Sequence, residues 1–226
     1  MSKQDQYTMT DPRTQYDSDH THYNSDQPDP ALDKKLDPSA DHGETTYRGS
    51  ERLKGRKALV TGGDSGIGRA VAIAFAREGA DVVINYLPSE KVDGESTLEI
   101  LKEAGVSAKG IAGDIKEEDF CVSLVDEAKG FLDGLDIVVN NAGKQQFVED
   151  IENLTTEQFR TTFETNVFAM FWITKAAVKH MPPGASIINT TSIQCYQPSA
   201  GLLDYASTKG AITSFTKSLA KMVIDK

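Results

Sequence analysis

The stretch "RKALVTGGDSGIGRAVAIAFAREGADVVINY", residues 56–86, decides the fold. It begins with a short apolar run that ends in glycines, and it continues with apolar residues at helical spacing. Gly79 is suited to end this helix, because glycine readily takes the left-handed conformation of a C-cap. The buried-looking run "DVVINY" follows. The pattern predicts two strands joined by a helix.

The same alternation continues along the chain. We expect, in order, a helix over about 94–104, a strand in "AKGIAGDI" (108–115), a helix over 117–132, a strand in "LDIVVNNAG" (135–143), a long helix from about 156 to 180, a strand in "ASIINTTS" (185–192) and a closing helix. Strands that alternate with helices of this length predict an α/β fold, in which helices cover both faces of a parallel sheet. This domain would span residues 51–226.

Residues 1–50 have a different character. They lack Val, Ile, Phe, Trp and Cys but hold four of the eight prolines and ten acidic residues. Such a segment buries too little apolar surface to offset its chain entropy, so we predict a polar, acidic arm that is largely disordered or extended. A sharper alternative docks this arm on a neighbouring surface through Tyr7, Tyr16, Tyr23, Tyr47, Leu32 and Leu36. His20 and His22 have no further ligands nearby, so we expect no metal there.

The overall composition excludes several classes of partner. The net charge of −10 argues against nucleic acid and anionic membranes, because both require a basic surface. No run approaches the roughly eighteen apolar residues of a membrane span, and the N-terminus lacks the apolar segment of a secretion signal. We therefore expect a cytoplasmic protein. Cys121 and Cys195 are too few and too far apart for a disulfide framework or a zinc site, so we expect both to be free.

The turn "TGGDSGIG", Thr61–Gly68, suits a phosphate group. Glycine lets the backbone turn with positive φ and approach a ligand closely, and the N-terminus of the following helix offers free N–H groups with partial positive charge. An acidic protein can therefore still bind a dinucleotide. The spacing differs from the general GxGxxG fingerprint, and a glycine-rich turn can also serve only to join a strand to a helix.

Several motifs in order carry a resemblance to a known family. They are "TGGDSGIG", "GDI" at 113–115, "NNAG" at 140–143, Asn166 in "ETNVF", Ser192 and "YASTK" at 205–209. Over residues 53–226 the sequence resembles the short-chain dehydrogenase/reductase family. Its polar N-terminal extension and the segments "INYLPSE" and "SIQCYQPS" are similar to a stress-associated bacterial branch of NAD(P)-dependent oxidoreductases. The resemblance implies a Rossmann-type doubly wound sheet with strand order 3-2-1-4-5, and a homo-oligomer.

The resemblance also implies which residues hold the cofactor. The phosphates and the adenosine ribose would contact Gly62, Ser65, Gly66, Ile67 and Gly68; Asn85 would lie nearby, Asp114 and Ile115 at the adenine, and Asn141, Ala142 and Gly143 beside the nicotinamide and its ribose. All these loops follow strands, and an open parallel sheet forms its ligand crevice at the strand C-termini.

The pair Tyr205 and Lys209 has the spacing that proton transfer needs. Reduction of a carbonyl requires a proton donor beside the nicotinamide, and a free tyrosine has a pKa of about 10. A lysine four residues on lies on the same helical face, where its ammonium favours the phenolate. By resemblance, Lys209 also contacts the nicotinamide ribose. A tyrosine and a lysine at this spacing are, alone, more often a solvated face.

Two further residues complete the set that the resemblance implies. Ser192 lies thirteen residues before Tyr205 and would orient the substrate oxygen. A serine hydrolase is excluded, because no GxSxG elbow surrounds Ser192. Asn166 would hold a water in a proton relay to Lys209. Asparagine inside a helix competes for backbone hydrogen bonds, so its presence there needs an explanation.

The choice of nicotinamide cofactor is open at the sequence level. An acidic residue at the end of the second strand favours NAD, and an arginine favours NADP. This chain has Asn85 and Tyr86, and Ser65 stands where NADP-preferring relatives often carry arginine. Neutral pairs like Asn85 and Tyr86 also occur in NADP users, and we favour NADP.

Family members continue beyond the closing helix into a sixth and a seventh strand and a substrate-covering segment. None follows Lys226, so we expect a fragment or a truncated product with an exposed apolar edge at Ile187 and Ile188. Such a chain, expressed alone, is expected to aggregate or to bind cofactor weakly. The function implied is hydride transfer between NAD(P) and a small substrate, which interconverts an aldehyde, ketone or sugar with the corresponding alcohol. The alternative is a non-catalytic dinucleotide-binding or interaction module.

Overall fold

The computed structural model describes residues 5–11, 13, 27, 31–36 and 39–225. Tyr16, Tyr23, His20 and His22 lie outside these residues. Tyr7 is 71% exposed. The proposed arm over residues 1–50 stays a prediction.

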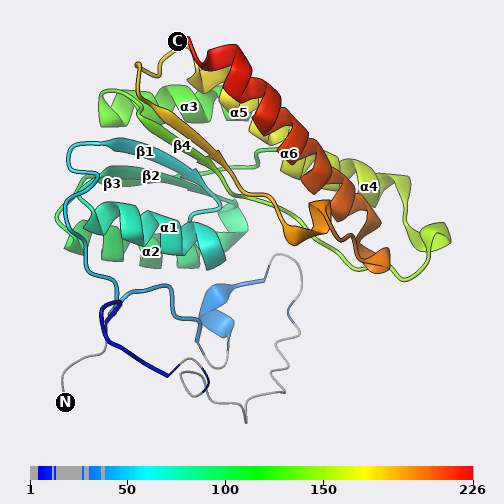
Figure 1. Cartoon of the computed structure of the whole chain (residues 1–226), viewed down its shortest axis with the longest axis horizontal. Helices are drawn as coiled ribbons and strands as arrows, with labels where there is room; N and C mark the ends of the chain where they lie inside the picture. The colour runs from blue at the N-terminus through cyan, green and yellow to red at the C-terminus, as the bar shows by residue number, and fades with distance from the viewer. Residues whose placement is uncertain (1–4, 12, 14–26, 28–30, 37–38, 226) are drawn as a thin grey trace.

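The domain is built on one sheet of five parallel strands (Figure 1). The strands are β1 (Lys57–Thr61), β2 (Asp81–Tyr86), β3 (Ala108–Ala112), β4 (Ile137–Asn140) and β5 (Ser186–Asn189). Their order is β3-β2-β1-β4-β5, which confirms the predicted doubly wound topology. Each return to a neighbouring parallel strand requires a crossover, and helices provide it.

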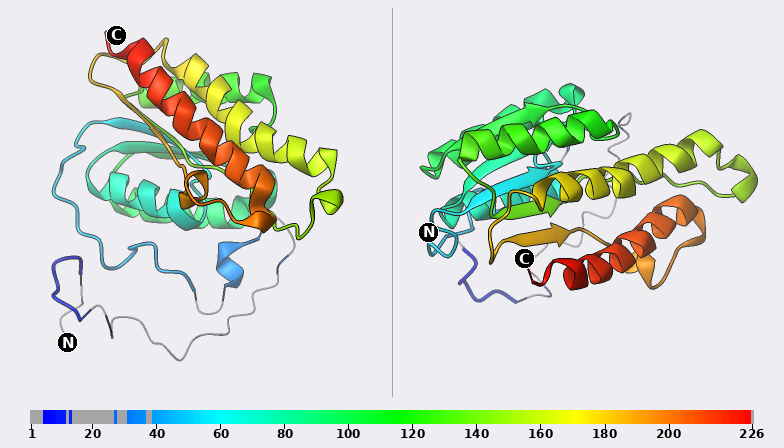
Figure 2. Two further views of the ribbon diagram at one scale, coloured as in Figure 1. Left: turned by 45° about the vertical axis from the view of Figure 1, so that its right-hand side comes forward. Right: turned by 90° about the horizontal axis from the view of Figure 1, so that it is seen from above.

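Helices cover both faces of the sheet. The helices α1 (Gly66–Arg77) and α2 (Lys91–Glu103) lie on one face, and α3 (Glu118–Leu132), α5 (Ala169–Ala177) and α6 (Leu203–Val223) lie side by side on the other (Figures 1 and 2). The short turns are η1 (Asp33–Lys35), η2 (Pro88–Glu90), η3 (Ile151–Asn153), η5 (Ile193–Cys195) and η6 (Ala200–Leu202). None of the described helices is long and apolar enough to cross a membrane.

The helix predicted over 156–180 has a more complex form. It consists of α4 (Thr156–Phe163), a π-helical turn η4 (Glu164–Phe168) and α5, which ends at Ala177. Thr155 caps its start by accepting a hydrogen bond from the Gln158 backbone N–H (3.1 Å). The π turn falls at Asn166, a feature that helical periodicity in the sequence does not reveal.

The strands send alternate residues into two separate cores. Leu59 and Val138 pack against α3 and α5, whereas the neighbouring Val60 and Val139 pack against α1 and α2. All four side chains are at most 2% exposed. Because both faces are buried, the strands are apolar along their whole length, as in "ALV" and "IVV".

The strand β5 is an edge of the sheet. Ile187 packs against the core formed by α3 and α5, but Ile188 points to the other face and is 46% exposed. Of the two residues predicted at an exposed apolar edge, Ile188 is exposed and Ile187 is half-buried. Of the two free cysteines, Cys121 is fully buried, and burial raises the pKa of its thiol to about 12.

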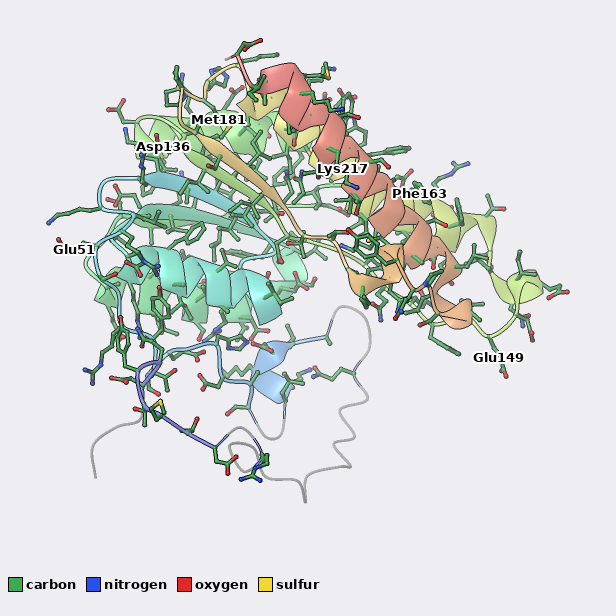
Figure 3. The ribbon with its side chains drawn as sticks, in the orientation of Figure 1. Glu51, Asp136, Glu149, Phe163, Met181 and Lys217 are labelled. Atoms are coloured by element: carbon green, nitrogen blue, oxygen red, sulfur yellow. The ribbon has the colours of Figure 1, made fainter. Side chains whose placement is uncertain are left out.

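All strands end at the same side of the sheet. Asp136 lies directly before β4, and Glu149 lies in the loop that follows this strand. Figure 3 shows the two residues on opposite sides of the molecule. The loops after β1, β2, β3, β4 and β5 therefore share one edge, where an open α/β sheet forms its crevice.

The described part of the N-terminal segment contacts α2 through a buried carboxylate. Asp93 is 1% exposed and accepts hydrogen bonds from the backbone N–H groups of Asp33 (2.7 Å) and Lys34 (3.2 Å). Its oxygens take the place of intrahelical partners that η1 lacks. The turn η1 is thus fixed beside the start of α2.

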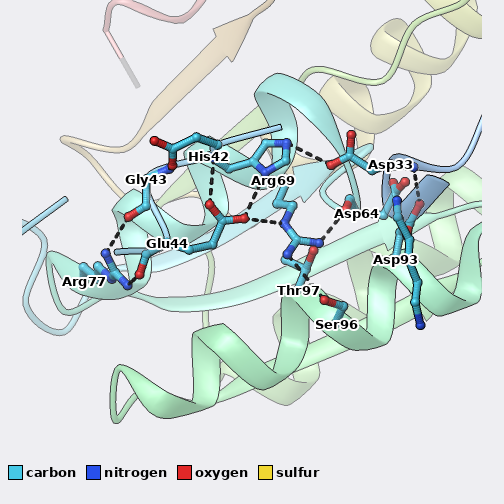
Figure 4. A network of polar contacts seen from close by, with 12 residues as sticks. Asp33, His42, Gly43, Glu44, Asp64, Arg69, Arg77, Asp93, Ser96 and Thr97 are labelled. Carbon is cyan, nitrogen blue, oxygen red and sulfur yellow. Dashed lines mark hydrogen bonds and ion pairs between the residues drawn. The ribbon is translucent and has the colours of Figure 1, made fainter. Parts of the chain in front are cut away.

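A second contact joins the segment to α1 (Figure 4). The His42 ring lies between two carboxylates, with Nδ1 2.9 Å from Glu44 and Nε2 2.9 Å from Asp33. Glu44 also pairs with Arg69 of α1 (3.3 Å), and Arg69 donates to Ser96 of α2 (3.4 Å). The side chains of His42 and Arg69 are only 6% and 11% exposed, so these contacts are largely shielded from water.

The third contact is made by Glu78, which directly follows α1 and binds residues of the chain that leads into β1. Its carboxylate accepts hydrogen bonds from the Tyr47 hydroxyl (2.6 Å), the Arg52 guanidinium (2.7 Å) and the Ser50 backbone N–H (2.9 Å). The bond from Arg52, followed by that from Tyr47, lowers the pKa of Glu78 well below its ordinary value. The chain that enters β1 is thereby fixed to the domain.

We expect Glu78→Gln to lower the melting temperature at pH 7 by several degrees, because the donors from Tyr47, Ser50 and Arg52 lose a charged acceptor. The pKa of Glu78 is lower in the folded state than its unfolded value of about 4.3. Its contribution to stability is therefore fully present above that value and is lost as pH falls below it toward the folded-state pKa. Thermal unfolding measured from pH 7 to pH 3 should show the two proteins converge. Glu99→Gln, on the exposed side of α2, is the control. A constant difference across this range would contradict the assignment.

Candidate functional site

Two loops that follow β1 and β4 lie against each other. Gly62 has φ of +60°, and a Cβ there would stand 3.0 Å from Ala142 Cα. A Cβ on Gly68 would overlap the Gly62 carbonyl oxygen and lie 2.6 Å from Asn141 Nδ2. Only glycine fits these two positions, so "TGGDSGIG" and "NNAG" form one unit.

The hydroxyl of Thr61 holds this unit together. Its Oγ1 accepts hydrogen bonds from the backbone N–H groups of Asn141 (3.0 Å) and Ala142 (3.1 Å). Thr61 is 1% exposed, so these bonds are buried. They bring the end of β4 beside the start of α1, whose first-turn N–H groups have no intrahelical acceptors.

A cavity of about 590 Å³ opens at this edge of the sheet. Eleven of the residues predicted from the sequence line it: Gly62, Ser65, Ile67, Asn85, Asp114, Ile115, Asn141, Ala142, Gly143, Tyr205 and Lys209. Gly66, Gly68, Asn166 and Ser192 do not line it. The volume lies within the range of small-molecule and cofactor sites.

The residues present fit a dinucleotide. The glycine turn and the free N–H groups of α1 suit a pyrophosphate, and no acidic residue occurs in the first turn of α1. The cavity continues from this turn past the end of β3 to Tyr205, so it offers room for a ligand with two ends. Ile67 is 66% exposed at the start of α1, where an apolar side chain can cover a bound ring.

The sequence did not single out two acidic residues that line the cavity, Asp64 and Glu90. Asp64 is 2% exposed, and burial raises its pKa. The Thr97 hydroxyl donates to the Asp64 carbonyl oxygen (3.0 Å), which ties the glycine turn to α2. Glu90 accepts from the Leu87 backbone N–H (3.0 Å). Asp64 lies within the glycine turn and Glu90 within "INYLPSE", but no feature of the sequence marks either residue as a cavity residue.

Tyr205 and Lys209 face the cavity from the first two turns of α6. Lys209 Nζ lies 5.2 Å from the centroid of the Tyr205 ring and donates to the Thr190 carbonyl oxygen (2.9 Å). Lys209 is 3% exposed, and burial lowers its pKa to about 8. The ammonium is therefore less costly to deprotonate than that of an exposed lysine.

Asn166 lies behind the cavity, in the π turn. Its Oδ1 accepts from the Lys144 backbone N–H (2.7 Å), and its Nδ2 donates to the Lys144 carbonyl oxygen (2.9 Å) and to Thr208 Oγ1 (3.0 Å). These bonds explain an asparagine inside a helix, since its amide groups pair with a loop and with α6. A Cβ on Gly143 would lie 3.4 Å from Asn166 Oδ1 and 3.8 Å from Lys209 Nζ, which places all three close together.

Ser192 follows β5 at the start of η5. Its hydroxyl oxygen accepts a hydrogen bond from the Gln194 backbone N–H (3.2 Å). It is partly exposed, while its neighbour Thr190 lines the cavity. Of the four residues predicted to be catalytic, Tyr205 and Lys209 line the cavity, Asn166 lies behind it beside Gly143, and Ser192 is not among the lining residues.

Comparison with known proteins identifies the family. The model of the family "short chain dehydrogenase" matches residues 56–226. The chain belongs to the short-chain dehydrogenase family. This confirms the resemblance, and it makes the protein an oxidoreductase that acts on CH–OH groups with a nicotinamide dinucleotide.

Similar proteins in the family include one whose name refers to stress, in agreement with the stress-associated branch. The chain is 54% identical over 218 residues to "Uncharacterized oxidoreductase YghA" of Escherichia coli, covering 96% of this chain and 74% of that protein. It is 46% identical over 195 residues to "General stress protein 39" of Bacillus subtilis, covering 86% and 68%. The solved structure of a short chain dehydrogenase from Burkholderia cenocepacia in complex with NADP is 35% identical, with a TM-score of 0.73 over 76% of this chain and 70% of that one.

Gly68→Ala should weaken binding of NADPH by at least about tenfold. The new methyl group would overlap the Gly62 carbonyl oxygen, and the turn would have to open to relieve this overlap. Quenching of intrinsic fluorescence during titration with NADPH measures the affinity. Gly130→Ala is the matched control, since a Cβ there meets nothing within 4 Å and lies in α3, away from the cavity. Equal affinities of the two variants would show that the turn does not hold the dinucleotide.

Proposed function

We propose that the protein transfers hydride between NADP(H) and a small carbonyl or alcohol, namely an aldehyde, ketone or sugar, with Tyr205 as general acid and base. The observation that carries this proposal is that Tyr205 and Lys209 line the same cavity as the glycine turn. Proton donor and dinucleotide therefore share one space. When bound, the nicotinamide supplies or accepts the hydride.

Tyr205 is the residue that exchanges a proton with the substrate oxygen. In the direction of reduction its hydroxyl donates the proton as negative charge builds on the carbonyl oxygen, and in oxidation the phenolate takes the proton back. Lys209, whose Nζ lies 5.2 Å from the ring centroid, stabilises the phenolate by its charge. Its burial means that little solvent screens this interaction.

Ser192 and Asn166 assist in this proposal. The hydroxyl of Ser192 orients and polarises the substrate oxygen, for which the side chain must turn from its contact with the Gln194 backbone N–H. Asn166 fixes the loop at Lys144 and the helix α6, and it holds a water that links Lys209 to solvent. Homo-oligomerisation and a cytoplasmic location remain predictions.

We propose that the glycine turn with Gly62, Ser65, Gly66, Ile67 and Gly68 holds the phosphates and the adenosine ribose. Asp114 and Ile115 contact the adenine, and Asn141, Ala142 and Gly143 border the nicotinamide. The relative from Burkholderia cenocepacia, solved with NADP, supports NADP over NAD. Asn85 is neutral, but its amide donates to the carbonyl oxygens of Ile111 (3.1 Å) and Gly113 (3.2 Å), so it shapes this end of the cavity. Titration with NADH beside NADPH tests the preference.

Tyr205→Phe is expected to lower kcat/KM for carbonyl reduction at least about a hundredfold, because it removes the proton donor and keeps the ring. The affinity for NADPH and the melting temperature should stay close to those of the unmodified protein. NADPH oxidation, followed at its absorbance band with a panel of aldehydes, ketones and sugars, provides the measurement. Tyr196→Phe, at a tyrosine that is 69% exposed, is the control. Undiminished turnover in Tyr205→Phe would end the proposal, and NADPH binding without turnover in the unmodified protein would favour a binding module.

Reduction should slow as pH rises through about 8, the pKa to which burial lowers Lys209, since the neutral amine no longer stabilises the phenolate. In Lys209→Arg this limb of the kcat/KM profile should move to higher pH, because a guanidinium stays charged at every pH of the assay. Initial rates measured from pH 6 to pH 10 give this limb for the unmodified protein and for Lys209→Arg. The same limb in both proteins would exclude Lys209 as its source.

A further inference from the structure

The helix α6 presents two adjacent faces that differ in role. Tyr205 and Lys209, four residues apart, face the cavity. Asp204 and Thr208, also four residues apart and one position earlier, form the neighbouring stripe, and Ile212 continues it into the core. Asp204 is 1% exposed and Thr208 is 0% exposed. The buried stripe therefore runs directly beside the reactive one.

Asp204 joins α6 to α4. Its Oδ2 accepts hydrogen bonds from the Thr162 hydroxyl (2.7 Å) and the Gln158 side-chain amide (3.3 Å), and its Oδ1 accepts from the Tyr205 backbone N–H (2.8 Å). The Thr162 hydroxyl also lies 3.0 Å from the Gln158 carbonyl oxygen, but the contact with the carboxylate is shorter. One carboxylate thus connects α4 to the backbone of Tyr205 itself.

Thr208 makes a second connection one turn along. Its hydroxyl donates to the Tyr205 carbonyl oxygen (2.6 Å) and accepts from Asn166 Nδ2 in the π turn (3.0 Å). The N–H and the carbonyl group of Tyr205 are therefore each held by a neighbour on the buried stripe. Both neighbours are in turn fixed to the helix that contains Thr162 and Asn166.

The choice of a carboxylate at position 204 needs a reason. Among the described residues no ion pair to Asp204 is present, so hydrogen bonds and the N-terminus of α6 stabilise its charge. A buried charge costs more than an apolar side chain would at the same place. Hydrogen bonds depend on angle as well as distance, so they constrain the rotation of a helix more narrowly than an apolar contact at the same place would.

We propose that Asp204 and Thr208 are positioning residues that fix the rotation of α6, and hence the place of the Tyr205 hydroxyl and the Lys209 ammonium relative to substrate and cofactor. The inference rests on the proposed role of Tyr205. Proton transfer requires donor and acceptor within hydrogen-bond reach, and a small displacement lowers the rate steeply. Thr162 acts through Asp204 and touches neither Tyr205 nor Lys209 in any contact described above.

Thr162→Val tests this inference most cleanly. It removes the donor to Asp204, keeps the shape of the side chain and changes a residue that does not line the cavity. Thr162→Ser keeps the hydroxyl and serves as the rescue variant. Asp204→Asn, alone and combined with Thr162→Val, tests the residue that accepts this hydrogen bond. Ser207→Ala is the control on the same helix, since the Ser207 hydroxyl is exposed and donates to the Leu203 carbonyl oxygen (2.7 Å).

The measurements are kcat and KM for carbonyl reduction, the affinity for NADPH, the melting temperature, and hydrogen exchange of the α6 amides. We expect Thr162→Val and Asp204→Asn to lower kcat about tenfold with unchanged affinity for NADPH, well below their melting temperatures. The amides of the first turn of α6 should exchange faster in both. The kcat of the double variant should be no lower than that of the more impaired single variant, because the two residues act as one unit. Thr162→Ser and Ser207→Ala should retain kcat.

Three results would overturn the inference: undiminished kcat in Thr162→Val, an equal loss in Thr162→Ser, or a loss that appears in the affinity for NADPH instead of kcat. Tyr205→Phe separates this failure from failure of the proposed function. If Tyr205→Phe is inactive and Thr162→Val is not impaired, only the positioning role is wrong. If Tyr205→Phe retains full activity, the proposed function itself is wrong.

Discussion

The parallel direction of the five strands is the constraint on which the site depends. Each strand must be followed by a crossover, so every loop that leaves a strand end emerges at the same edge of the sheet. The glycine turn after β1 and the "NNAG" turn after β4 meet there because β1 and β4 are neighbours. Their contact has no room for a side chain at Gly62 or Gly68, so the shape of the cavity follows from the order of the strands.

The helix α6 adds Tyr205 and Lys209, the proposed proton-transfer residues, to an edge that the sheet has already formed. The face of α6 toward the cavity is defined by the spacing of Tyr205 and Lys209, and we propose that the rotation of the helix is set by neighbours on other elements. The π turn at Asn166 brings one of these neighbours inward, and α4 supplies another through Thr162. Buried hydrogen bonds suit this role because they fix direction as well as distance.

The N-terminal segment lies outside the region that matches the family, which begins at residue 56. In its described part it contacts α1 and α2 through Asp93, Arg69 and Glu78. These contacts are mostly polar, in agreement with the low apolar content of the segment. A segment that cannot form a core of its own can still be ordered where it completes the hydrogen bonds of buried charges on a folded domain.

The sequence by itself determined the order of strands and helices, the glycine turn and the pairing of Tyr205 with Lys209, because these depend on periodicity and on spacing within one element. Tertiary structure alone decided which separate elements meet. It placed the Thr190 carbonyl oxygen against Lys209, put Asp64 and Glu90 on the cavity, inserted the π turn and buried Asp204 against Thr162. The partners in these contacts are far apart in the chain, and no local pattern encodes a distance between elements that only the packed sheet sets.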